Sequence, residues 1–146
     1  MIFESYSEEE TFEFARKLAL EASPGDIYTL TGDLGVGKTA FTKGFAAGLG
    51  IDEPVVSPTF TFVQVYDDGR LPLYHFDVYR VGDVSEMDEI GYEDYFFGDG
   101  VSIMEWADLV PEIIPDNAVR ITITKDLSKG VMYRRIQIFG AERITE

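Results

Sequence analysis

Hydrophobic positions in the first half of the chain switch between helical and strand-like spacing. After Ser7, apolar side chains recur every four residues, at Phe14, Leu18 and Ala22. This interval predicts an amphipathic helix, for which Ser7 is a candidate N-cap and Glu10 occupies the capping-box position. The Ser-Pro-Gly-Asp segment at residues 23–26 is expected to end the helix.

A buried strand and a second helix are predicted next. Residues 27–31, Ile-Tyr-Thr-Leu-Thr, indicate a buried strand, and residues 39–49 again carry apolar side chains at helical spacing. Gly50 suits the C′ position of that helix. The glycine-rich segment between the two elements therefore connects a strand to a helix.

The second half of the chain is richer in strand patterns. Residues 59–66 and 71–79 are joined by an Asp-Asp-Gly-Arg turn and predict a β-hairpin. Ser85 is expected to cap a helix that reaches about residue 95, and a turn or short helix is expected near residues 107–113. Three more strands are predicted, at residues 101–105, 118–124 and 131–139.

This order of elements predicts a layered α/β domain with a central mixed, mainly parallel sheet flanked by helices. No linker or low-complexity tract interrupts the 146 residues, so one domain spanning residues 1–146 is expected.

Composition narrows the classes of function. The chain has no cysteine, which excludes disulfides and thiol chemistry and suits a reducing cytosol. No apolar run approaches the roughly 18–20 residues that span a bilayer, so a cytoplasmic protein without a membrane association is expected. Twelve Lys and Arg against 27 Asp and Glu give a net charge of −15, which repels phosphate backbones. Any nucleic acid is therefore expected to be held by a partner, and the acidity serves either solubility or docking.

The glycine-rich segment carries the clearest chemistry. It satisfies the spacing G-x-x-x-x-G-K-[ST] of a phosphate-binding loop (P-loop) in full, with Gly32, Asp33, Leu34, Gly35, Val36, Gly37, Lys38 and Thr39. Glycines let the backbone wrap around phosphate oxygens, and the N-terminus of the following helix, which continues through Ala40, adds N–H donors. Lys38 is expected to reach the β- and γ-phosphates, and the Thr39 hydroxyl to bind Mg²⁺. The predicted class is a P-loop NTPase-like domain that binds ATP.

Two apolar strand patterns end in a carboxylate, as a magnesium site requires. Asp77 ends residues 73–77 and is the candidate for the acidic residue of the Walker B strand. Glu105 ends residues 101–105 beside Trp106 and is either a second metal ligand or a surface glutamate. His75 shares a strand face with Asp77, and this spacing suits a hydrogen-bonded structural histidine better than a general base.

Other motifs restrict the choice of nucleotide and reaction. Thr59, in the Ser-Pro-Thr-Phe segment, either offers its hydroxyl to the γ-phosphate or its metal, or belongs to a turn. The chain has no N-K-x-D segment, and Asp77 is followed by Val-Tyr-Arg rather than a D-x-x-G switch, so adenine is favoured over guanine. The arginines are scattered, which disfavours a small-molecule kinase. No glutamate follows Asp77 to orient water, so hydrolysis by the chain alone is expected to be slow.

Four blocks together resemble the bacterial ATPase family of tRNA threonylcarbamoyladenosine biosynthesis (the TsaE, or YjeE, family). Besides the phosphate loop they are Ser57-Pro58-Thr59-Phe60-Thr61-Phe62-Val63, His75-Phe76-Asp77-Val78-Tyr79-Arg80 and Glu105-Trp106. The resemblance implies an ATPase required for threonylcarbamoyl modification of the adenosine next to the anticodon. It also implies that the protein acts through the threonylcarbamoyl-transfer complex, touches tRNA only indirectly, and does not transfer the group itself. A nucleotide-gated binding switch, in which ATP occupancy rather than hydrolysis is the signal, is the alternative.

The resemblance also assigns roles to single residues. It implies that Thr39 and Glu105 are Mg²⁺ ligands, with Asp77 in the inner or outer shell of the metal. Lys38 remains the phosphate lysine, Thr59 becomes switch-like and Trp106 lies near the nucleotide. It adds three adenine-side contacts, Glu8, Thr11 and Arg134. The family often has proline after the Glu-Trp pair, whereas this chain has Ala107.

Overall fold

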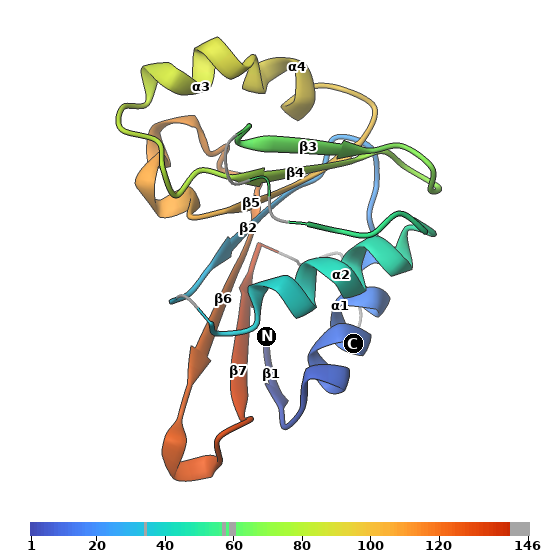
Figure 1. The fold of residues 1–146 in the computed structure, drawn as a ribbon, viewed down its shortest axis with the longest axis vertical. Helices are drawn as coiled ribbons and strands as arrows, with labels where there is room; N and C mark the ends of the chain where they lie inside the picture. Colours follow the sequence, from blue (N-terminus) through green and yellow to red (C-terminus); the bar gives the residue numbers. More distant parts are fainter. Residues whose placement is uncertain (34, 57, 59–60, 141–146) are drawn as a thin grey trace.

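A mixed sheet forms the centre of the molecule in the computed structural model, which describes residues 1–33, 35–56, 58 and 61–140. Within these residues seven strands lie in the order β1-β7-β6-β2-β5-β4-β3 (Figure 1). The strands are β1 (Ile2–Ser5), β2 (Ile27–Thr31), β3 (Val63–Tyr66), β4 (Leu73–Asp77), β5 (Val101–Glu105), β6 (Val119–Lys125) and β7 (Arg134–Phe139). The central pairings β6–β2, β2–β5 and β5–β4 are parallel, and those toward both edges are antiparallel. The prediction of a mixed sheet that is parallel at its centre is confirmed.

Helices cover both faces of the sheet (Figure 1). The α-helices are α1 (Glu8–Leu20), α2 (Lys38–Gly48), α3 (Ser85–Ile90) and α4 (Tyr92–Phe96), and the 3₁₀ helices are η1 (Ala107–Leu109), η2 (Pro111–Ile113) and η3 (Leu127–Lys129). Buried residues of α1 and α2 share a hydrophobic cluster with one face of the sheet. Those of α3 and α4 share a second cluster with the other face. None of the helices in the described ranges is long and apolar enough to cross a membrane.

The predicted signals at the ends of the first two helices are confirmed. The Ser7 hydroxyl accepts a hydrogen bond from the Glu10 N–H, and the Glu10 carboxylate accepts one from the Tyr6 N–H. Gly50 is at C′ of α2 with φ 79°, and its N–H donates to Ala47. The next residue donates to the carbonyl of Ala46, which completes a Schellman motif.

Helices α1 and α2 approach each other at two glycines of α2. A Cβ atom at Gly44 would collide with the carbonyl oxygen of Phe12, and one at Gly48 with that of Arg16. Helix axes can come this close only where a side chain is absent. This contact attaches α2, which begins in the phosphate loop, to the N-terminal helix α1.

Two sequence-based expectations differ from the structure, and one strand was not expected. The helix expected from Ser85 to about residue 95 is two helices, because Gly91 adopts a left-handed conformation with φ 79°. The N-cap prediction for Ser85 is wrong, since Val84 is the N-cap and the Ser85 hydroxyl donates to Asp83 instead. Strand β1 was not predicted, because its four residues are too few to show an alternating pattern without their partner β7.

The expected hairpin is confirmed with shorter strands. Strands β3 and β4 pair antiparallel over residues 63–66 and 73–76. Residues 59–60, at the start of the first predicted strand, lie outside the described residues. The predicted strands at residues 101–105, 118–124 and 131–139 correspond to β5, β6 and β7, although β7 begins only at Arg134.

Candidate functional site

The phosphate-loop motif connects the carboxyl end of β2 to the amino end of α2. Gly35 and Gly37 adopt φ values of 75° and 111°, in the left-handed region that favours glycine. Helix α2 starts after Gly37 without a side-chain cap. No side chain of the N-cap residue therefore competes for its first N–H groups, the donors that bind an anion at a helix N-terminus. Leu34 lies outside the described residues.

Lys38 is folded back over this loop. Its side chain is 5% exposed, and its Nζ donates to the carbonyl oxygen of Gly32 at 2.7 Å. Nζ also lies 3.6 Å from the centre of the Trp106 ring, a cation–π contact. Burial lowers the pKa of Lys38, whereas the negative charges of Glu105 and Asp77 act in the opposite direction. The lysine is thus a buried cation held beside carboxylates.

The two candidate metal carboxylates lie side by side. Strands β4 and β5 are parallel neighbours, and their register pairs Asp77 directly with Glu105. The carboxyl ends of both strands lie beside the carboxyl end of β2, where β2 leads into the phosphate loop. In α/β proteins, ligands bind outside the carboxyl ends of the parallel strands. The structure therefore brings together two residues that are 28 positions apart in sequence.

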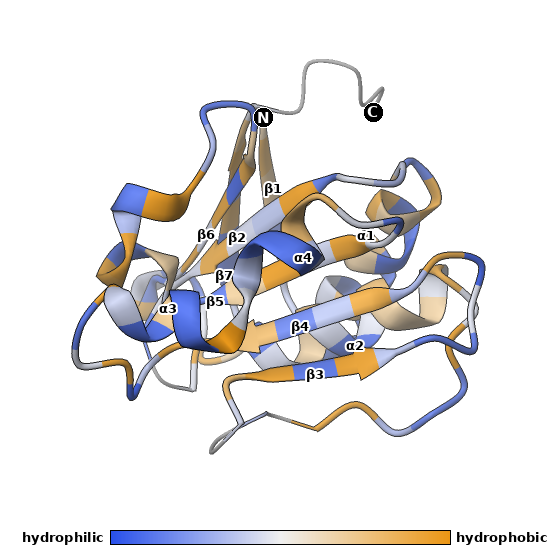
Figure 2. Cartoon of the chain, turned by 90° about the horizontal axis from the view of Figure 1, so that it is seen from above, coloured by the Kyte–Doolittle hydropathy of each residue, from blue (hydrophilic) through white to orange (hydrophobic). Residues whose placement is uncertain are grey.

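Both carboxylates lie on the sheet face that α2 covers. Leu73 of β4 and Ile103 of β5 belong to the hydrophobic cluster of α1 and α2, and alternate residues of a strand share a face. His75 and Asp77 follow Leu73 on this face, and Glu105 follows Ile103. Figure 2 shows hydrophilic positions between hydrophobic ones along β4. Each strand thus changes from apolar to polar residues as it approaches the phosphate loop.

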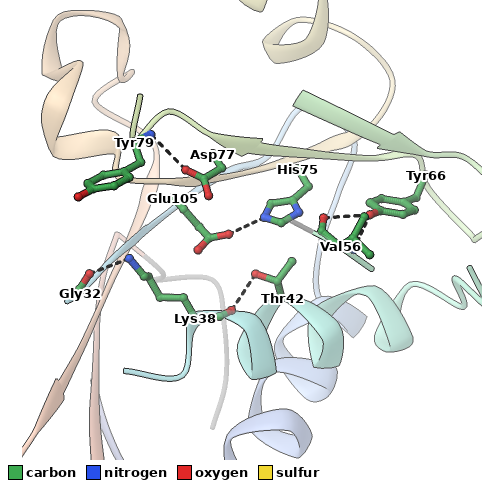
Figure 3. A network of polar contacts seen from close by, with 9 residues as sticks. All are labelled: Gly32, Lys38, Thr42, Val56, Tyr66, His75, Asp77, Tyr79 and Glu105. Carbon is green, nitrogen blue, oxygen red and sulfur yellow. Dashed lines mark hydrogen bonds and ion pairs between the residues drawn. The ribbon is translucent and has the colours of Figure 1, made fainter. Parts of the chain in front are cut away.

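His75 contacts the second candidate carboxylate. Its Nε2 lies 2.6 Å from Oε2 of Glu105, and the two residues are only 2% and 6% exposed. Figure 3 shows Glu105 between His75 and Lys38, with Asp77 beside it. The Tyr79 N–H donates to Oδ1 of Asp77 at 3.1 Å. The expectation of a hydrogen-bonded histidine on the Asp77 face is confirmed, but its partner is Glu105.

The residues present fit a magnesium ion bound together with phosphate. The described part of the chain contains no cluster of three or more His, Cys, Asp or Glu residues arranged for a metal. Mg²⁺ does not need one, since it keeps several waters and takes one or two carboxylates together with phosphate oxygens. Asp77, Glu105 and the exposed Thr39 hydroxyl at the start of α2 supply such a partial set. Thr59 lies outside the described residues.

An open cavity of about 660 Å³ lies between the starts of α1 and α2. Thr39 and Ala40 line it from α2, and Glu8 and Phe12 line it from α1. The position of Glu8 is compatible with the predicted adenine-side contact, which stays a prediction. Thr11 does not line this cavity; it is 2% exposed and its hydroxyl is 2.7 Å from that of Ser5, in the packing of α1 against β1.

Arg134 and Trp106 make contacts that sequence reasoning missed. Nε of Arg134 donates to the carbonyl oxygen of Val36 at 2.7 Å, so this residue braces the phosphate loop from β7. Trp106 has φ 64°, a strained conformation for a bulky residue. Its ring packs against that of Tyr79, with 4.7 Å between the ring centres. No local sequence signal announces either contact, because each joins segments far apart in the chain.

Together the parallel centre of the sheet, the glycine loop and the buried lysine at the start of α2 define a P-loop NTPase-like domain. The family model described as "Threonylcarbamoyl adenosine biosynthesis protein TsaE" matches residues 5–136. The chain belongs to this family, and its role lies in the biosynthesis of threonylcarbamoyladenosine in tRNA.

Individual relatives agree with this membership. The tRNA threonylcarbamoyladenosine biosynthesis protein TsaE of Bacillus subtilis (strain 168) is 54% identical over 117 residues, which cover 80% of this chain and 73% of that protein. The protein of the same name from Treponema pallidum (strain Nichols) is 44% identical over 99 residues, 68% of this chain and 73% of the relative. The crystal structure of YdiB from Bacillus subtilis superposes with a TM-score of 0.80 at 42% identity, covering 94% of this chain and 83% of that one.

Proposed function

We propose that this protein is a Mg²⁺-dependent ATPase that serves tRNA threonylcarbamoylation through the threonylcarbamoyl-transfer complex, without transferring the group itself. The observation that carries the proposal is the convergence of Lys38, Asp77 and Glu105 at one end of the sheet. Lys38 is buried over the phosphate loop, and the two carboxylates are register partners on adjacent parallel strands. A cation for phosphate beside two ligands for a metal is the arrangement that phosphoryl chemistry requires.

Each group has a defined task in this proposal. The N–H groups at the start of α2 and the Lys38 ammonium bind the β- and γ-phosphates. Thr39 and Glu105 hold Mg²⁺, with Asp77 in its inner or outer shell. When bound, Mg²⁺ supplies positive charge that offsets the charge of the phosphate oxygens. The cavity lined by Glu8, Thr39 and Ala40 adjoins the loop and is the proposed place of the adenosine.

Charge supports an indirect relation to tRNA. At a net charge of −15 the chain lacks the basic footprint of a nucleic-acid-binding protein. Proteins of the transfer complex are therefore proposed to hold the tRNA, in the cytoplasm, while this chain binds those proteins. The lack of cysteine is in keeping with a reducing compartment.

The nucleotide assignment can be tested with the fluorescence of Trp106, the single tryptophan of the chain. Because its ring lies 3.6 Å from Nζ of Lys38, phosphate binding to that lysine is expected to change the emission. MgATP and MgADP should produce saturable changes at concentrations where MgGTP produces little. Equal responses to adenine and guanine nucleotides would contradict the adenine assignment.

A nucleotide-gated switch is the second candidate function. One observation favours it, since Val78, and no glutamate, follows Asp77 to orient an attacking water. In the switch, ATP occupancy alone would signal to the partner proteins.

The variant Glu105→Ala separates the two functions. If hydrolysis is the working step, this variant should still bind ATP but fail to support repeated rounds of tRNA modification with the partner proteins, and Lys38→Ala should fail as well. The measurement is the yield of modified tRNA per transfer complex over time. A Glu105→Ala protein that binds ATP and sustains multiple rounds would establish occupancy as the signal.

A further inference from the structure

His75 is a buried polar side chain to which the proposed ATPase chemistry assigns no task. It projects from β4 toward the neighbouring strand and contacts one oxygen of Glu105. Both side chains are almost fully shielded from water, at 3% and 8% exposure. A hydrogen bond of 2.6 Å in such surroundings is strong and directional, because no water competes for either group.

The two ring nitrogens of His75 lie in different surroundings. Nδ1 of His75 is buried and has no hydrogen-bond partner among the described residues. An ionised carboxylate oxygen can only accept a hydrogen bond, so the ring nitrogen that contacts it carries the hydrogen. The hydrogen on Nε2 is therefore donated to Oε2 of Glu105.

Glu105 needs an anchor of this kind because a competing cation is close. Of the neighbouring negative charges, that of Glu105 does most to raise the pKa of Lys38 against the effect of burial. Even so, no ion pair of 4.0 Å or less joins Lys38 and Glu105 in the part of the chain that the structure describes. Figure 3 shows the second carboxylate oxygen of Glu105 directed away from His75, toward the side where Lys38 lies. If the glutamate rotated freely, it could pair with the lysine, and both groups would be lost to the nucleotide.

We propose that His75 is a positioning residue. Its Nε2–H holds Oε2 of Glu105, which leaves the other oxygen in a fixed direction for Mg²⁺ and keeps the carboxylate apart from Lys38. This inference rests on the proposed function, because it assigns Glu105 to the metal. Hydrogen-bond partners of metal ligands commonly contribute 10- to 100-fold in metal affinity.

Two amide substitutions test the proposal with matched chemistry. The amide nitrogen of His75→Gln reaches the place of Nε2 and can donate to Glu105, whereas that of His75→Asn reaches only the place of Nδ1. Both replace the ring by a smaller amide, so a packing defect alone would affect them alike. The affinity of Mn²⁺ for the protein–ATP complex, measured by electron paramagnetic resonance, should fall about 10- to 100-fold in His75→Asn and stay near the wild-type value in His75→Gln.

The single histidine also permits a test without substitution. Nitrogen-15 NMR of the wild-type ring should show a hydrogen on Nε2, and Glu105→Ala should abolish the preference for this position. A ring protonated on Nδ1 alone would overturn the proposal, as would equal Mn²⁺ affinities in the two amide variants. Wild-type protein that binds ATP but no Mn²⁺ would overturn the metal site itself, and wild-type protein that binds no ATP would overturn the proposed function.

Discussion

Replacing Lys38 with alanine is expected to lower the rate of ATP hydrolysis by about 10²- to 10³-fold, the usual effect of removing one preorganised donor from a charge-stabilising site. Lys38 is 5% exposed and its Nζ already lies within the loop, 2.7 Å from the carbonyl oxygen of Gly32. Binding phosphate there requires only a short movement from that carbonyl and from the Trp106 ring. The charge also acts at close range, since water is largely excluded.

Phosphate release in a single turnover, in the presence of the partner proteins if the chain alone is slow, measures this effect. Lys17→Ala is the matched control, because it removes an equal charge from an exposed position in the last turn of α1. The control should hydrolyse ATP at the wild-type rate. If Lys38→Ala hydrolysed ATP at the wild-type rate, the phosphate-loop lysine would have no part in the reaction.

The variant Gly44→Val is expected to lower the free energy of unfolding by about 3 kcal/mol or more, at the upper end of overpacking effects. The reason is the backbone contact between α1 and α2, where even a Cβ atom would meet the carbonyl oxygen of Phe12. A flexible side chain could move away, but a helix backbone cannot move without displacing α1 from the sheet. Such a loss is a large fraction of the roughly 5–15 kcal/mol that stabilise a typical domain.

Denaturation in urea, followed by far-ultraviolet circular dichroism, provides the measurement. Helix propensity does not account for such a loss, because valine is no worse a helix former than glycine. The control Ala47→Val places valine at an exposed position of the same helix, away from the contact with α1, and should cost no more than about 0.7 kcal/mol. If both variants lost the same small amount of stability, the close approach of the two helices would be wrong.

Local features of the site could be predicted from sequence because they depend on neighbouring residues. The phosphate loop occupies eight consecutive positions, and its strand and helix were recognisable from hydrophobic spacing. The Ser7 N-cap and the C′ glycine Gly50 are likewise defined by residues within one or two helical turns. The split at Gly91 was missed because a single glycine inside a helical pattern does not reveal whether the chain continues or turns.

Contacts between distant segments depended on strand register. Asp77 and Glu105 were separate candidates in the sequence, and only the parallel pairing of β4 with β5 makes them neighbours. The same register places His75 diagonally across from Glu105, which changes an ordinary buried histidine into the partner of a proposed metal ligand. A shift by one residue would turn these side chains to the opposite face of the sheet.

The sequence by itself therefore determined the phosphate loop, the alternation of strands and helices, and the family resemblance, because each is written in consecutive residues or short blocks. Only the tertiary structure decided that Lys38 lies over Trp106 and that α1 meets α2 at Gly44. It also decided that Glu105 is anchored by His75. These contacts arise when the sheet and the helix layer bring distant segments together, and their geometry is set by packing that no local pattern encodes.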